Sequence, residues 1–378
     1  MLRIELLVGL DDAFGRAIAR GVVRFAKSRS DWKLYGYGRL FADPREIEGS
    51  EGPRADGLIA RVESADQAKA LAALQLPIVD VAGAYPGSGF REVNNDDFLT
   101  GRRAGEYLRG LGFKRFAFCS VAGTAWSRLR TQGFTEASGY SIQDLRSFER
   151  PLEWWKERNR ESDDFAKWLK GLGAPTALFT CNDIVGLKAS ETCRRASIAV
   201  PGDLAILGVD DEDLLCELAD PSLSSIKLDC EGIGTAAAEL LAGMLRSATV
   251  PRVLRIAPRD IVERESTRTI ASEDELASRA AAWIRANASR GVNVSQLVKA
   301  MPASRRSLEL RFKAALGLSL GDALKEARLD QSKRLLDSTD LTLDELADAC
   351  GFGSLQRFHV AFKKREGITP GAWRKAGR

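Results

Sequence analysis

The chain has 378 residues, 44% of them hydrophobic and 29% charged, which suits two or three domains with real cores and excludes a broadly disordered chain. No apolar run reaches about 18 residues, so we expect no membrane partner. The net charge of +4 is uneven, because residues 273–378 carry +6 and the remainder −2, which indicates a polyanion partner for the C-terminal part.

The cysteine and histidine content limits the chemistry further. The six cysteines form no C-x-x-C pair, and Met1–Val8 is too short and too acidic for a signal peptide. We therefore expect reduced thiols buried in a cytoplasmic protein. The single histidine, His359, excludes a multi-histidine metal site and a histidine-based triad, and we expect no metal and no cofactor.

Residues 1–264 alternate short apolar runs with helical stretches. The strand candidates are Ile4–Val8, Leu34–Tyr37, Gly57–Ala60, Ile78–Ala82, Arg115–Ser120, Ala177–Cys181, Leu204–Val209 and Ser225–Leu228. Helical periodicity lies between them, for example over Gly15–Lys27, Phe98–Leu111, Phe165–Lys170, Val185–Arg195 and Ile233–Leu245. This alternation predicts an α/β fold of two doubly wound parallel-sheet lobes.

The pattern changes near residues 264–274. Ser272–Glu275 reads as a capping box, and after it only helical spacing is found. We expect residues 265–274 to be a linker and residues 275–378 to form an all-α domain.

This C-terminal part contains an internal repeat of 50 residues. Phe312 and Gly317 in the first copy correspond to Phe362 and Gly367 in the second. Each copy reads as short helix, tight turn and longer helix, over about 294–317 and 342–367, with a serine N-cap and a glycine stop on the longer helix. The repeat predicts two helix-turn-helix motifs, joined by a helix over 320–337.

A helix-turn-helix places its second helix in the major groove of double-stranded DNA. In the first copy we expect DNA contacts from Ser304, Arg305, Arg306, Glu309 and Arg311, and in the second from Ser354, Gln356, Arg357, His359, Lys363 and Lys364. Arginine and glutamine suit bidentate contacts to guanine and adenine, whereas Arg311, Lys363 and Lys364 suit phosphates. The competing interpretation is a plain helical bundle with a solvated basic face.

The C-terminal residues carry a resemblance to a known family. Gly351-Phe352, Phe358, Phe362-Lys363-Lys364, Gly367, Thr369-Pro370 and Trp373-Arg374 resemble the C-terminal signature of AraC-type DNA-binding domains. The resemblance covers residues 275–378 and implies a sequence-specific transcription regulator.

Polar side chains follow several strands of the larger part. Asp11, Asp12 and Phe14 follow the first strand, and Asn182, Asp183 and Asp210 follow later ones. Carboxyl ends of parallel strands meet at one sheet edge, where acids and amides suit sugar hydroxyls and Phe14 or Trp126 could cover an apolar face. Asp and Asn at these places can equally be helix N-caps.

Residues 3–264 resemble the effector-binding core of the LacI family, which has the periplasmic-binding-protein fold. The motifs are Val93–Asp96, Phe179–Asp183, Val200–Asp211 and Arg128-Leu-Arg130 before Phe134. The resemblance implies that Arg130, Asn182 or Asp183, and Asp210 contact the ligand, with Arg128 in the same segment. The family's N-terminal DNA-binding headpiece is not expected, since the sequence starts on the first strand.

The two parts together resemble XylR-type transcription regulators. That resemblance implies a small sugar effector, with the pentose D-xylose first, a homodimer, and RNA polymerase as a further partner of an activator. Effector binding between the lobes would then reposition the DNA-binding domains.

Two alternatives remain open. One is a regulator gated by phosphorylation, or by another non-sugar signal, because Asp11-Asp12 after a strand is also found in receiver domains. The other is an enzyme with a helical appendage, although no G-x-G-x-x-G, P-loop or G-x-S-x-G motif is found, so we expect no enzyme.

Overall fold

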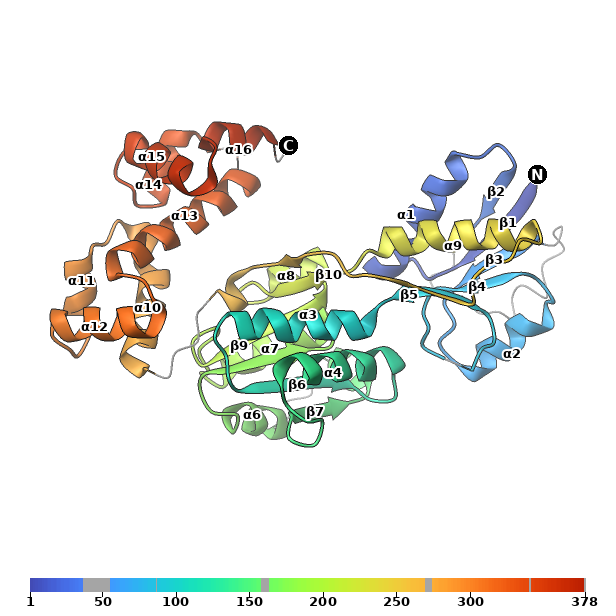
Figure 1. The fold of residues 1–378 in the computed structure, drawn as a ribbon, viewed down its shortest axis with the longest axis horizontal. Coiled ribbons are helices and arrows are strands. Elements are labelled where there is room, and N and C mark those ends of the chain that lie inside the picture. The colour runs from blue at the N-terminus through green and yellow to red at the C-terminus, as the bar shows by residue number, and fades with distance from the viewer. Residues whose placement is uncertain (37–54, 86, 158–162, 269–273, 340, 377–378) are drawn as a thin grey trace. The chain divides into compact units, whose positions relative to one another are not determined.

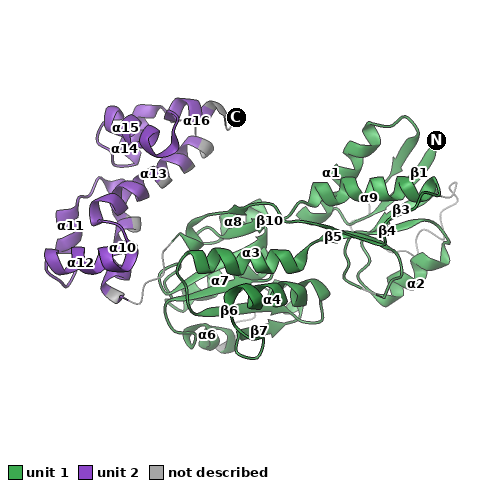
Figure 2. Cartoon of the chain, in the orientation of Figure 1, with its two compact units in different colours: residues 1–268 green, residues 269–378 purple. Residues whose placement is uncertain are grey.

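A computed structural model describes residues 1–36, 55–85, 87–157, 163–268, 274–339 and 341–376. The chain forms two compact units, residues 1–268 and 269–378 (Figure 2). The predicted fold class, two parallel-sheet α/β lobes followed by a helical domain, is confirmed. All six cysteines are buried and free, and none of the helices described is long and apolar enough to cross a membrane.

The first lobe is built on a six-stranded parallel sheet in the order β11-β5-β4-β3-β1-β2. Its strands are β1 (Leu2–Leu7), β2 (Trp32–Tyr35), β3 (Gly57–Ala60), β4 (Ile78–Asp80), β5 (Arg91–Asn95) and β11 (Val253–Ile256). Its helices are α1 (Ala13–Lys27), α2 (Ala65–Ala73) and α9 (Cys230–Leu245), and α9 lies beside α1 (Figure 1). The second strand begins earlier than predicted, and Tyr37 lies outside the described residues.

The second lobe has a six-stranded sheet in the order β12-β10-β9-β8-β6-β7, parallel except for β12. Its strands are β6 (Phe116–Val121), β7 (Arg146–Arg150), β8 (Thr176–Thr180), β9 (Leu204–Asp210), β10 (Ser224–Lys227) and β12 (Ile261–Val262). Its helices are α3 (Asp97–Gly110), α4 (Ala125–Ser138), α5 (Leu152–Lys156), α6 (Asp163–Lys170), α7 (Asp183–Arg195) and α8 (Asp213–Leu218).

The chain passes between the lobes three times, after β5, after β10 and after β11 (Figure 1). The first passage leads into α3, which packs closely on α4. A Cβ on Gly101 of α3 would lie 1.9 Å from the carbonyl oxygen of Arg130 in α4. Only glycine allows this approach, which brings the start of α3 next to Arg130.

The second unit contains α10 (Glu275–Asn287), α11 (Val294–Lys299), α12 (Arg305–Leu316), α13 (Leu320–Ser338), α14 (Leu343–Ala349), α15 (Leu355–Glu366) and α16 (Pro370–Ala376). It has two cores. Leu308 and Phe312 of α12 fill the first, and Phe358 and Phe362 of α15 fill the second, as predicted. Helix α13 belongs to both, through Leu320 and Leu324 in one and Leu329 and Leu336 in the other.

The junction between the units differs in part from the predicted linker. Residues Glu265–Thr267 form a 3-10 turn in the first unit, where Ser266 and Thr267 are fully buried. Residues 269–273 lie outside the described residues, and with them the capping box that we predicted from Ser272. Helix α10 is instead capped by Asp274, whose side chain accepts a hydrogen bond from the amide of Ala277.

Candidate effector site and DNA-reading helices

Arg130 is held rigidly at the carboxyl end of the second sheet. It is 5% exposed, and both its Nε and its Nη2 lie 2.9 Å from Oδ1 of Asp97, the first residue of α3. Its Nη1 donates to the carbonyl of Cys181 and lies 3.9 Å from Oδ1 of Asp210. The Arg130 guanidinium also lies 5.0 Å from the ring centre of Trp126. The structure therefore joins three of the predicted residues, Trp126, Arg130 and Asp210.

Asp210 combines an unusual backbone conformation with a raised carboxyl pKa. It ends β9 at a φ of 110°, and Asp211 follows at 53°. Burial raises the pKa of Asp210 to about 6, although the nearby charge of Arg130 lowers it. Two successive non-glycine residues with positive φ are uncommon and concentrate at functional turns.

The first lobe contributes a second charged group. The charges of Asp12 and Arg61 also act on the Asp210 carboxyl, Asp12 raising its pKa and Arg61 lowering it. Asp12 caps α1 through the amide of Gly15 and forms an ion pair with Arg61, which also lies 5.3 Å from the ring centre of Phe14. Asp12 is thus both a helix cap, as the competing interpretation held, and part of an interlobe charge cluster.

Four other predicted effector contacts lie in different surroundings. Asn182 caps α7 by accepting from the amide of Val185. Asp11 and Arg128 have exposed side chains. Asp183 is buried among internal donors, so the structure gives it a positioning role rather than a place facing a ligand.

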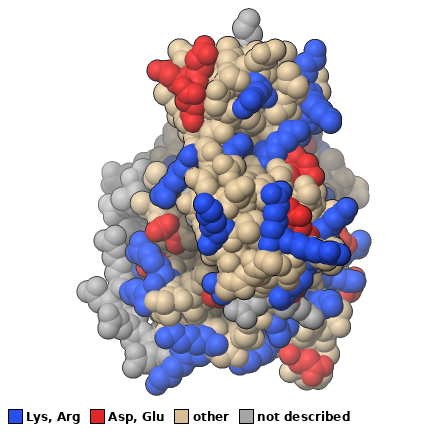
Figure 3. Space-filling view, turned by 90° about the vertical axis from the view of Figure 1, so that its left-hand side faces the viewer, with Lys and Arg blue, Asp and Glu red and all other residues tan. Residues whose placement is uncertain are grey.

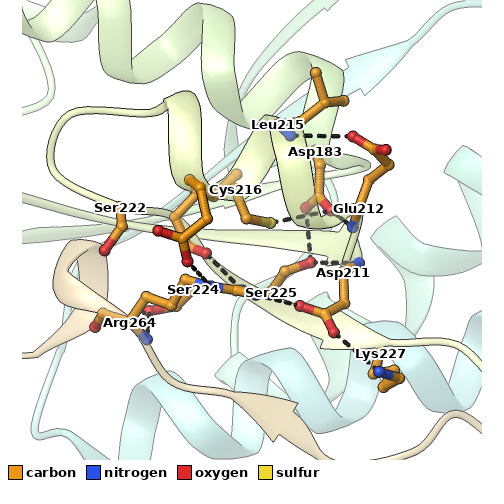
Figure 4. A network of polar contacts seen from close by, with 12 residues as sticks. Asp183, Asp211, Glu212, Leu215, Cys216, Ser222, Ser224, Ser225, Lys227 and Arg264 are labelled. Carbon is orange, nitrogen blue, oxygen red and sulfur yellow. Dashed lines mark hydrogen bonds and ion pairs between the residues drawn. The ribbon is translucent and has the colours of Figure 1, made fainter. Parts of the chain in front are cut away.

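The buried polar network of Figure 4 explains the position of Asp183. Its Oδ1 accepts from Ser225 at 2.6 Å, and its Oδ2 accepts from the amide of Glu212 at 2.9 Å and from the Cys216 thiol at 3.4 Å. Burial and the charge of Asp210 raise the pKa of Asp183 well above its usual value. Asp183 therefore anchors the turn that contains Asp210 and Asp211.

The same network reaches the end of the first unit (Figure 4). The Asp211 side chain is 3% exposed and accepts from Nη2 of Arg264 at 2.8 Å, while Nζ of Lys227 lies 3.4 Å away. Arg264 also donates to the carbonyl of Leu223, and its backbone amide donates to Ser224. Residues 265–268, at the end of the unit, follow directly after Arg264.

Two residues of this site were missed by sequence reasoning, namely Asp97 and Arg61. The motif Val93–Asp96 ends one residue too early, because Asp96 caps α3 and it is Asp97 that pairs with Arg130. The run of four polar residues over Asn94–Asp97 indicates the position in the sequence, but only the phase of α3 shows which side chain turns toward α4. Arg61 follows β3 as the other candidates follow their strands, and that position could have identified it.

The two candidate recognition helices, α12 and α15, begin and end as predicted. The hydroxyls of Ser304 and Ser354 accept from the amides of Ser307 and Arg357, both at 3.3 Å. Both helices end at a left-handed glycine, Gly317 at φ 73° and Gly367 at 78°. The serines therefore act as caps in this structure.

Most of the predicted DNA-contacting side chains are exposed. This holds for Arg305, Arg306, Glu309, Gln356, Arg357, Lys363 and Lys364. Arg305 forms an ion pair with Glu309 at 2.9 Å, one turn along α12. Figure 3 shows Lys and Arg side chains over much of one face of the molecule, with smaller groups of Asp and Glu among them.

Two residues of this group have less accessible or paired polar atoms. Arg311 forms a bidentate pair with Asp274, at 2.7 and 2.8 Å, which ties α12 to the start of α10 while the Arg311 side chain stays 49% exposed. His359 is half-buried, and its Nε2 is buried with no hydrogen-bond partner among the described residues. Helix phase explains both, since these positions border the face that packs on neighbouring helices.

Comparison with known proteins identifies the family. Residues 106–267 match the model of a periplasmic binding protein-like domain, and residues 297–376 match a helix-turn-helix domain. The xylose operon regulatory protein of Escherichia coli K12 is 30% identical over 98% of this chain and 96% of its own length. The chain belongs to the family of xylose operon regulatory proteins.

Other members of the xylose operon regulator family agree with this assignment. The Haemophilus influenzae protein is 27% identical over 98% of both chains. A solved structure described as the xylose-binding transcription activator xylR covers 99% of this chain and 98% of its own, with a TM-score of 0.76 at 28% identity. These are DNA-binding transcription regulators, so the alternative of an enzyme with a helical appendage is set aside.

Proposed function

We propose that this chain binds D-xylose, or a closely similar pentose, between the two lobes of residues 1–268 and in response activates transcription from DNA bound by residues 269–378. The observation that carries the proposal is the rigid Arg130, fixed by the buried Asp97 and set 3.9 Å from Asp210. A fixed donor beside a carboxylate suits two neighbouring sugar hydroxyls, one accepting and one donating.

The remaining side chains fit the same ligand. Trp126 and Phe14 offer aromatic rings for the apolar face of a sugar, and Asp12 and Arg61 offer further polar atoms from the first lobe. A sugar held by groups of both lobes favours the arrangement in which all of them reach it. The sugar changes DNA binding only to the extent that it binds this lobe arrangement more tightly than the sugar-free arrangement.

The names of the relatives support xylose as the effector and activation, as opposed to repression, as its effect on transcription. The Escherichia coli relative is called a xylose operon regulatory protein, and the related structure is described as xylose-binding and as an activator. We further propose a homodimer, the commonest soluble assembly, acting in the cytoplasm and, as an activator, through RNA polymerase.

On the DNA side, we propose that α12 and α15 enter successive major-groove segments. Arg306, Gln356 and Arg357 would contact base edges, and Lys363 and Lys364 phosphates. Helix α13 has 19 residues and spans about 28 Å, which is near the roughly 34 Å between successive faces of the groove.

Isothermal titration calorimetry tests the sugar directly. The full chain is titrated with D-xylose, D-ribose, L-arabinose and D-glucose, alongside Asp210→Asn and the control Asp213→Asn, an exposed carboxylate three residues away. We expect D-xylose to bind the parent chain and the control, and Asp210→Asn to lose at least tenfold in affinity, about 1.4 kcal/mol. Absence of heat with every sugar, or equal affinity in Asp210→Asn, contradicts the proposal.

A further inference from the structure

The second unit exposes four large aliphatic side chains among its described residues, and they form two pairs. Leu310 and Val360 are 63% and 65% exposed, and Leu318 and Ile368 are 38% and 41% exposed. Each pair is separated by 50 residues, the period of the internal repeat. Exposure at equivalent places in both copies calls for a common physical reason.

The reason is clear for one pair only. Leu318 and Ile368 directly follow the left-handed glycines that end α12 and α15, where an apolar residue commonly packs back on the last helical turn. Leu310 and Val360 lie in the middle of their helices, two residues before the fully buried Phe312 and Phe362. Nothing in helix capping or in the two cores requires an aliphatic side chain there.

Their position on the helices matters more than their exposure. Leu310 lies four residues after Arg306, and Val360 four after Gln356, so each pair shares one helix face. Val360 and Gln356 line the same hollow of about 550 Å³ between α13 and α15, which Arg357 and Lys364 also line. An aliphatic contact thus sits among polar and cationic side chains on the side that would meet DNA.

We infer that Leu310 and Val360 contact thymine 5-methyl groups in the major groove, so that each recognition helix reads a thymine next to the base contacted by Arg306 or Gln356. This rests on the proposed DNA-reading role of α12 and α15. The thymine methyl is the apolar group that bases present in the major groove, and aliphatic side chains are suited to it. Two single residues on separate helices do not form the contiguous apolar patch typical of a protein-docking surface.

Replacing thymine by deoxyuridine tests the inference one methyl group at a time. The binding site is first selected from a random DNA library with the full chain. Each thymine of the selected duplex is then replaced by deoxyuridine, which keeps base pairing and removes only the methyl. We expect at least one thymine under each helix whose replacement weakens binding about fourfold, the value of one buried methyl.

The variants assign each thymine to its side chain. In Val360→Ala the deoxyuridine effect should disappear at one thymine and persist at the other, and Leu310→Ala should show the reverse. Ile368→Ala, an exposed aliphatic at the capping position, should keep both effects. A selected site in which no methyl matters, or effects that survive both substitutions, overturns this inference alone. Failure to select any sequence would overturn the DNA-reading role together with it.

Discussion

Arg264→Met tests how strongly the Asp211 turn is held to the end of the first unit. Methionine retains most of the side-chain volume but removes the 2.8 Å contact to Asp211 and the 3.0 Å contact to the carbonyl of Leu223. The side chains are only 13% and 3% exposed, and breaking a buried pair costs about 3–5 kcal/mol. Lys227 remains 3.4 Å from Asp211, so we expect the free energy of unfolding to fall by about 3 kcal/mol.

Arg259→Met is the matched control. Arg259 lies 2.8 Å from Asp229, the same distance as in the buried pair, but its side chain is 56% exposed. An exposed pair contributes less than about 1 kcal/mol, so the two substitutions should differ by roughly 2 kcal/mol or more.

Urea unfolding followed by tryptophan fluorescence measures both losses, because Trp154 and Trp155 are buried in the second lobe and report on its core. Asp211→Asn completes a double-mutant cycle, in which the double variant should lose less than the sum of the single losses. Equal losses in Arg264→Met and Arg259→Met, or additive losses in the cycle, would show that burial of this pair does not stabilise the turn.

Three further outcomes are expected. Burial raises the pKa of Asp80 to about 6, above its usual value near 3.9, so ionising it costs stability as the pH rises from about 4 to 6. Asp80→Asn keeps an oxygen for the amides of Val62 and Ala82, and its unfolding free energy relative to the parent should rise by about 3 kcal/mol between pH 4 and 7 in urea titrations; a flat difference contradicts this. Lys363→Ala should lower the salt slope of DNA binding by about one, whereas Arg311→Ala, whose charge is paired with Asp274, should leave it unchanged in fluorescence anisotropy. Arg306→Ala should relax base preference at one position, by about 1–3 kcal/mol, in competition with mismatched duplexes, and undiminished discrimination would remove Arg306 from base reading.

The elements that could be predicted from the sequence are those that show one consistent local signal, such as a buried apolar run or a helix cap. Strands such as β8 and β9 are buried on both faces and appear as continuous apolar runs, and the caps at Ser304 and Ser354 follow from local hydrogen bonding. Strand β7, by contrast, is an edge strand that reads RSFER, with only Phe148 buried. Its pairing with β6 depends on tertiary structure, so no local pattern indicated it.

The candidate site was predicted to the level of the sheet edge and no further. Topology brings the residues after parallel strands together, which is why Asp210 was expected at this edge, whereas Arg130 was assigned through the resemblance to the LacI family. Whether a polar residue at that edge faces inward or outward depends on the phase of the following helix. For this reason Asp97 was not predicted, and sequence alone could not show that Asp183 is held by three internal donors.

The turn after β9 shows why the two functions of the chain can share one structural element. Asp210 faces Arg130 at the candidate sugar site, while the next residue, Asp211, is bound by Arg264 just before the first unit ends. The two residues are consecutive in the chain and both have positive φ, so a backbone shift at Asp210 also displaces Asp211. A sugar that draws Asp210 toward itself therefore alters the ion pair between Asp211 and Arg264. Arg264→Met should weaken the sugar dependence of DNA affinity, while DNA affinity without sugar stays near that of the parent. Gel shifts with and without D-xylose measure both quantities, and an unchanged sugar response in that variant would place the connection between the units elsewhere.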